Sequence, residues 1–186
     1  MKVLAQIGLK NFYYAVLTSD TAGDATNAGS TSYETPKKIG NAVSVDINPS
    51  TETAYLYGDD MAVATDISLQ QVEVTIETTD IPLEDLAALL GHSYAGDTLT
   101  AKGADTAPDV ALLFESQKHD GGIRCVKLVK GKFAPSQEQI NTKGESLEYQ
   151  VPQITGTFVS RQSDGVWKIV KDVAKGSSTS EWYNSV

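Results

Sequence analysis

Apolar and polar residues alternate with a period of two along much of this sequence, a pattern typical of β-strands that place one face on a core. Two stretches show it most clearly, 39–48 and 71–77. Their apolar positions are Ile39, Val43, Val45 and Ile47 in the first, and Val72, Val74 and Ile76 in the second. The segments Phe12–Leu17 and Val110–Phe114 are apolar on both faces, which predicts more central strands.

The stretch Ile123–Phe133 alternates less regularly, and two interpretations of it stay open. Ile123, Cys125, Val129 and Phe133 share one face. The other face carries the apolar pair Val126 and Leu128, framed by the cations Arg124, Lys130 and Lys132. If this second face points outward, Arg124, Val126, Leu128 and Lys130 form a subunit contact. The alternative is that both faces are buried within one subunit.

The alternation changes phase near Pro152. Leu147, Tyr149 and Val151 share one phase, whereas Ile154 and Phe158 take the opposite one. Because proline cannot donate a hydrogen bond to a strand ladder, the change predicts a bulge or an edge position.

One helix stands out among the strands. Its apolar residues Leu83, Leu86, Ala87 and Leu90 repeat at helical spacing. Asp80 is placed to cap its start, Pro82 fits the first turn, and Gly91 is placed to end it. We expect this helix to cover one face of the sheet. The segment Val166–Ala174 is a weaker candidate for a second helix.

Three segments have no clear period. Residues 19–36 are rich in Thr, Ser, Gly and Ala, which predicts a long mobile loop. Residues 48–66 contain Pro49 and a Gly58-Asp59-Asp60 turn, but Tyr55, Leu56 and Tyr57 are too apolar for a simple solvated loop. Loops of this length are uncommon unless they have a function. The tail 176–186 is polar except for Trp182 and Tyr183, which need a surface to pack on.

These elements predict a mainly β fold with one flanking α-helix. The 186 residues fit a single domain spanning 1–174, with long loops at 19–36 and 48–66 and a C-terminal arm at 175–186. Open strand edges invite pairing with a neighbouring copy.

The charge distribution is uneven. Residues 39–101 contain 11 Asp or Glu and no Lys or Arg, within a chain of net charge −9. This argues against a protein that grips nucleic acid, because such proteins need cations against the phosphates. An acidic surface for solubility is one interpretation. The other is an acidic face and a mildly basic face that meet between copies.

The sequence gives little sign of catalysis or of a bound cofactor. Tyr57-Gly58-Asp59-Asp60 spells a viral polymerase motif, but the chain is far too short for that enzyme, and a turn at the tip of a hairpin explains it better. A weak divalent-cation site at Asp59 and Asp60 remains an alternative. His92 and His119 are isolated, and Cys125 lies in a strand pattern that predicts a buried, inert thiol. No run of 18 apolar residues predicts a membrane span.

Several segments, taken in order, resemble one known family. Residues 8–17 (GLKNFYYAVL) resemble the opening strand of the major tail proteins of long-tailed, non-contractile phages of Gram-positive hosts. Residues 35–45 and the Tyr57–Asp60 element follow in the family's order and spacing. The 111–115 strand, the Asp164-Gly165 turn and the 181–186 end also fit. The loop 19–32 is longer than is usual in the family.

The resemblance implies a structural subunit with two packed antiparallel sheets and a flanking helix, a fold shared with the inner tube of type VI secretion systems. Copies of such proteins form hexameric rings that stack around the tape-measure protein, and DNA later passes through the tube during ejection. The implied partners are other copies, the tape-measure protein, and the distal tail and tail-terminator proteins. The implied location is the virion tail, after assembly in the host cytoplasm, with no cofactor. The alternatives are an inner tube of a contractile or secretion particle and a monomeric β-sandwich binding module.

Three sets of residues acquire expected roles within this picture. We expect Tyr55, Leu56, Tyr57, Gly58, Asp59 and Asp60 to form the contact between rings. We expect the acids Asp46, Glu73 and Glu77 to line the lumen, where like charge would let DNA slide without sticking. We expect Trp182 and Tyr183 to anchor the C-terminal arm.

Overall fold

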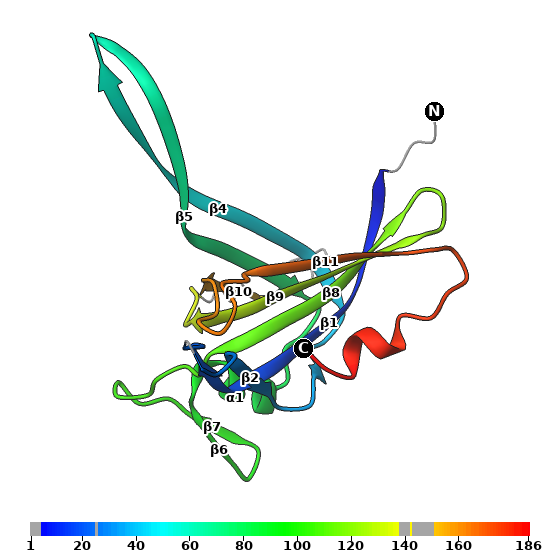
Figure 1. Ribbon diagram of the computed structural model, residues 1–186. Helices are drawn as coiled ribbons and strands as arrows, with labels where there is room; N and C mark the ends of the chain where they lie inside the picture. Colours follow the sequence, from blue (N-terminus) through cyan, green and yellow to red (C-terminus); the bar gives the residue numbers. More distant parts are fainter. Residues whose placement is uncertain (1–4, 25, 138–141, 143–150) are drawn as a thin grey trace.

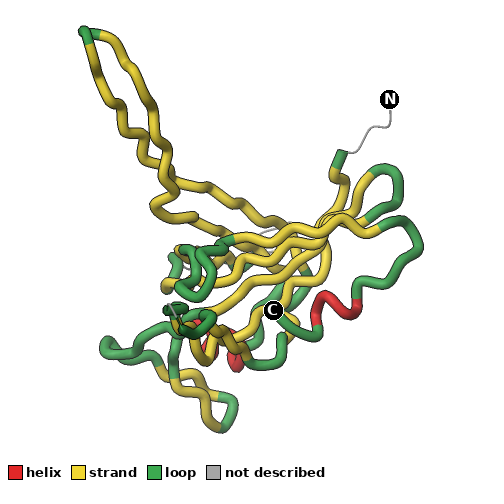
Figure 2. The backbone as a smooth tube through the Cα atoms, viewed as in Figure 1, coloured by secondary structure: helices red, strands yellow, loops and turns green. Residues whose placement is uncertain are grey.

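The fold is a folded-over antiparallel sheet from which one long hairpin projects (Figures 1 and 2). The computed structural model describes residues 5–24, 26–137, 142 and 151–186. The main sheet has nine strands: β1 (Gln6–Thr21), β2 (Ser30–Tyr33), β3 (Lys37–Lys38), β4 (Ala42–Gly58), β5 (Met61–Thr78), β8 (Val110–Lys118), β9 (Ile123–Ala134), β10 (Gln153–Phe158) and β11 (Lys168–Val173). A small separate hairpin pairs β6 (Ser93–Ala95) with β7 (Thr98–Thr100).

Strand β9 joins the two layers of the fold. One edge of β9 pairs with β8, whereas the other pairs first with β11 along 123–128 and then with β10 along 131–134. The hydrogen-bonded path runs β2-β1-β8-β9-β10-β5-β4. Its two halves face each other across one core, so the expected arrangement of packed antiparallel layers with one flanking helix is confirmed.

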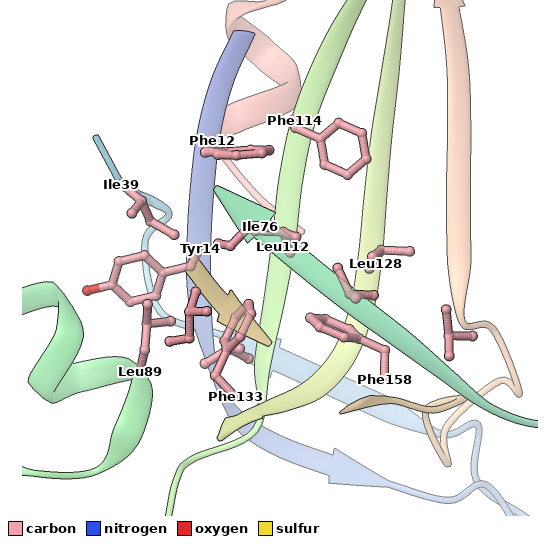
Figure 3. Close-up of a cluster of buried hydrophobic side chains, with 14 of the residues drawn as sticks. Phe12, Tyr14, Ile39, Ile76, Leu89, Leu112, Phe114, Leu128, Phe133 and Phe158 are labelled. Carbon is pink, nitrogen blue, oxygen red and sulfur yellow. The ribbon is translucent and has the colours of Figure 1, made fainter. Parts of the chain in front are cut away.

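The core is built from large side chains of both layers (Figure 3). Phe12 of β1 meets Phe114 of β8 edge to face, with ring centroids 5.9 Å apart, and Phe133 of β9 meets Phe158 of β10 in the same way at 5.7 Å. The Phe158 ring also lies directly over Gly131, where a Cβ atom would overlap it. Gly131 is the cross-strand partner of Phe158, so the missing side chain leaves the space that the Phe158 ring fills.

Helix α1 (Leu83–Leu90) covers the end of this core and ends at Gly91, whose φ of 73° is the left-handed conformation expected there. The prediction that Asp80 caps the helix is wrong. Pro82 is the N-cap residue, and no side chain makes a capping hydrogen bond to the first turn. Leu89 and Leu90 are buried while Leu83 is exposed, so the apolar face is rotated from the expected one. The Tyr14 hydroxyl donates to Asp85 at 2.8 Å and ties the helix to β1.

The largest correction concerns residues 48–66, which are not a loop. They continue β4 and β5 as one antiparallel ribbon, paired from Ala42 and Thr78 outward to Gly58 and Met61. The ribbon turns at Asp59 and Asp60, whose φ angles of 49° and 59° are those of a mirror-image two-residue hairpin turn. The expected turn at the hairpin tip is therefore correct, but its flanks are strands.

Two other segments also differ from expectation. Seven of the residues in 19–36 belong to strands, since β1 runs to Thr21 and pairs with β2. Residues 168–173 form β11 rather than a helix, because they pair with the first half of β9. Strand β10 begins directly after Pro152, at the expected change of phase. The predicted strand face at Leu147 and Tyr149 lies outside the described residues.

A buried carboxylate holds the β1–β2 hairpin against the β10–β11 connection. Asp20 accepts hydrogen bonds from the Lys130 ammonium at 2.7 Å and from the backbone N–H groups of Gln162 and Ser163 at 2.8 and 3.0 Å. Burial alone would raise the pKa of Asp20, but these donors together lower it to about 2.

Replacing Asp20 with Asn should lower the free energy of unfolding by about 2 kcal/mol at pH 7, since each pKa unit is worth about 1.4 kcal/mol. Because the folded pKa lies below the ordinary 3.8, this contribution is present above about pH 4 and is lost as the pH falls toward 2. Urea unfolding at several pH values measures it. Asp60→Asn at the exposed tip is the control. A difference that does not shrink in acid would contradict the assignment.

Candidate functional site

The outer half of the β4–β5 ribbon, residues 51–69, forms an arm that leaves the body of the fold (Figure 1). Strand β10 pairs with β5 only along 72–77, so within the described chain the arm has no strand neighbours other than its own two strands. At about 3.3 Å per residue, its eight residues on β4 and nine on β5 extend about 26–30 Å. The arm is thus an isolated two-stranded ribbon, a structure that is only marginally stable in water by itself.

One face of the arm is apolar. Alternation along β4 is unbroken from Ser44 to Gly58, because both bulges beyond Ser44 fall on β5. Tyr55 and Tyr57 therefore lie on the same face as Val45 and Ile47, which pack on the core. Their rings are 6.3 Å apart. Ile67 of β5 lies on the same face, because it pairs with Thr53.

This apolar face is uncovered in the single subunit. Tyr55, Tyr57 and Ile67 are 57%, 68% and 65% exposed. Near the tip, Met61 and Val63 are equally exposed, as is Leu56, which the register places on the opposite face of the ribbon. Contiguous exposed apolar surface rimmed by polar residues marks interaction sites in soluble proteins. The six residues expected to contact a neighbouring ring, Tyr55 to Asp60, all lie on this outermost part of the arm.

The opposite face of the ribbon is polar and acidic. Asp46 lies across from Thr75, Asn48 across from Glu73, and Ser44 donates to Glu77 at 2.7 Å. Asp46 and Glu73 are exposed and Glu77 is half-buried. The three acids predicted for the lumen therefore share one face, and Lys132 of β9 shares it as well, through Thr157.

The same register carries this acidic face outward along the arm. Glu52 and Asp66 lie on it, and Gln70 donates to Glu52 at 2.8 Å. The sequence-based prediction missed these two acids because residues 48–66 were interpreted as a loop. The even positions of β4, counted from Asp46, would have found Glu52.

The proposed outward-facing contact on β9 does not exist in the subunit. Val126 and Leu128 lie in the core, 6% and 0% exposed, so the alternative of burial on both faces is the correct one for this strand. The flanking cations are paired within the chain. Arg124 donates two hydrogen bonds to Asp172, and Lys130 donates to Asp20.

The C-terminal residues pack on the chain's own sheet. Trp182 and Tyr183 belong to a short 3-10 helix, Ser180–Tyr183. Tyr183 stacks on Tyr13 with ring centroids 4.5 Å apart, and its hydroxyl donates to Glu115 at 3.2 Å. Burial, followed by the Glu115 charge, raises the pKa of Tyr183 far above its ordinary value. The Lys127 ammonium lies 4.1 Å from the Trp182 ring centre.

Within the described residues, the histidines and the cysteine singled out in the sequence lie in separate parts of the fold. Among the described residues no group of three or more His, Cys, Asp or Glu is placed to hold a metal ion. His92 Nδ1 lies 2.8 Å from Asp105, and His119 sits in the β8–β9 turn. Cys125 is buried, and burial raises the pKa of its thiol. Within the same ranges, no helix has the length and apolar character needed to span a bilayer.

Comparison with known proteins agrees with a structural role. A search of curated proteins gives no match. The model of the family described as phage tail tube protein matches residues 4–186, and so includes the body, the arm and the C-terminal segment. The chain therefore belongs to the phage tail tube protein family, whose members are structural components of the virion tail.

Proposed function

We propose that this protein is the major tail subunit of a long-tailed, non-contractile phage of a Gram-positive host, and that its copies close into hexameric rings that stack into the tail tube. The observation that carries the proposal is the uncovered apolar face of the arm, with Tyr55, Tyr57 and Ile67 each more than half exposed. A surface of this kind is costly in a monomer and is stabilised when another copy covers it.

Ring closure uses the open edges of the sheet. In the described chain β4 pairs only with β5, β2 only with β1, and β11 only with β9, so each presents a free row of backbone groups. Pairing such edges between copies satisfies these groups and abolishes the edge when the ring closes.

The acidic face of β4 and β5 lines the lumen. Asp46, Glu73 and Glu77 share that face with uncharged Ser, Thr and Asn residues, and the three acids outnumber Lys132 of β9, which lies on it as well. Like charges repel over about 8–10 Å at ordinary ionic strength, whereas each phosphate–cation contact would add salt-dependent binding.

The remaining partners follow from the tail tube role. The rings enclose the tape-measure protein, meet distal tail and tail-terminator proteins at the ends, and conduct DNA during ejection. Assembly takes place in the host cytoplasm. The subunit works without a catalytic site or cofactor.

Deleting residues 55–60 should leave folded subunits that form rings but no tubes, because the arm loses the tip that reaches the next ring. The double substitution Tyr55→Ser/Tyr57→Ser should act in the same way with less disturbance of the backbone. Negative-stain microscopy of concentrated protein distinguishes rings from tubes. Glu52→Gln, on the opposite face of the arm, is the matched control and should form tubes. Normal tubes from the deletion would refute the role of the arm.

Replacing Asp46, Glu73 and Glu77 with Lys should leave tube formation intact and make the tubes retain short duplex DNA. Retention should fall steeply as salt rises, since the added cations exchange counterions with the phosphates. Co-sedimentation of labelled duplex with tubes measures it, with Glu84→Lys on α1 as the control. A cryo-EM map that places all three acids on the outer wall would disprove the lumen assignment.

A further inference from the structure

A groove of about 710 Å³ lies at the end of the body near helix α1. Its apolar lining comes from the segment before the helix, the helix itself, β7 and the start of β10. These residues are Ile81, Leu86, Leu90, Leu99, Val151 and Ile154. A volume of this order is typical of clefts that enclose a ligand, about 300–1,000 Å³. It has room for side chains of a partner.

The groove and the arm tip lie at opposite ends of one strand. Strand β5 starts at Met61 beside the tip and ends at Thr78, and the groove residue Ile81 follows almost directly. Val151 lies at the same end of β5, because it precedes Gln153, which pairs with Glu77 next to the end of the strand. The eighteen residues of β5 have a length of about 60 Å measured along the strand. Figure 1 shows the tip and helix α1 on opposite sides of the body.

The arm and the groove both present apolar side chains together with polar groups. The arm offers Tyr55, Tyr57 and Ile67 on one face, all exposed. The groove offers an apolar lining with polar groups from Asp80, Ser136 and Gln153 among its walls. Tyrosine is suited to such a site because its ring is buried against apolar side chains while its hydroxyl finds a polar partner.

We propose that the Tyr55–Tyr57–Ile67 face of one copy's arm seats in this groove of a second copy in the next ring. The assignment rests on the proposed tube function and adds the acceptor surface to it. A contact between two different surfaces at opposite ends of a molecule is heterologous, so it repeats without closing. It therefore extends a stack of rings indefinitely in one direction, as a tube requires.

The competing arrangement is a contact between two arms, each covering the other. Such a contact is isologous and joins only two rings. It would leave the groove without a role, so substitutions in the groove distinguish the two arrangements.

The first test is Val151→Glu, which puts a charge on the groove wall at a residue that is already 42% exposed. The matched control is Val159→Glu, the same change at a valine that is 37% exposed and does not line the groove. Both variants should keep the melting temperature of the wild type within a few degrees. Val151→Glu should give single rings, and Val159→Glu should give tubes of ordinary length. Tubes from Val151→Glu would overturn the proposal.

The second test mixes two variants that each fail to stack. Rings of Tyr55→Ser/Tyr57→Ser keep an intact groove, and rings of Val151→Glu keep an intact arm. Mixing them should give pairs of rings and nothing longer, because only one productive junction is available. A mixture that stays as single rings would overturn the groove as the acceptor.

The experiments distinguish a failure of the proposed tube function from a failure of the groove assignment alone. If the tube function is wrong, the wild-type protein forms no tubes under conditions where rings are seen, and that result overturns both proposals together. If only the groove is wrong, wild-type tubes form, the arm variant fails to stack, and Val151→Glu stacks normally.

Discussion

The pleat of the β4–β5 ribbon is the constraint on which the rest of the structure depends. Along β4 every odd position from Val45 to Tyr57 lies on one face and every even position on the other. A shift of one residue would exchange the two faces completely. In the body, Val45 and Ile47 pack against the core opposite Ile76 and Val74, and this burial fixes the register. The arm continues the same alternation, so the burial of Val45 and Ile47 also decides which residues of the arm share a face.

Sequence patterns predicted the parts of the fold in which that period is unbroken. The stretches 39–48 and 71–77 follow directly from it. The central strands follow instead from runs that are apolar on both faces, and the end of the helix follows from the left-handed conformation of Gly91. Residues 48–66 were misinterpreted because Pro49 and the two bulges on β5, at Gln70 and Val63, disturb the alternation that a local window detects. The decisive information was the pairing of β4 with β5 over their full length, which a single strand's sequence does not display.

The misassigned contact on β9 has a different cause. Strands β8 and β9 are apolar on both faces because each face has a cover within the subunit. Val126 and Leu128 face the core, while Cys125 and Lys127 face the C-terminal segment. The Lys127 ammonium donates to the Ser185 carbonyl at 2.7 Å, and burial lowers its pKa. The cover over Lys127 therefore comes from the end of the chain, a contact that a periodic pattern cannot identify.

The same ribbon also separates the two tasks that the proposed function assigns to the subunit. Contact with another copy needs apolar surface, and passage of DNA needs surface that does not bind phosphate. Tyr55 and Tyr57 lie on one face of the arm, whereas Glu52 and Asp66 lie on the other. When a neighbour covers the tyrosine face, the acidic face is the one that stays in water. In the proposed tube, an arm seated in the next ring carries the acidic face of the body across the junction between rings. Under that proposal, the stretch without Lys or Arg serves both tasks from opposite sides of one hairpin.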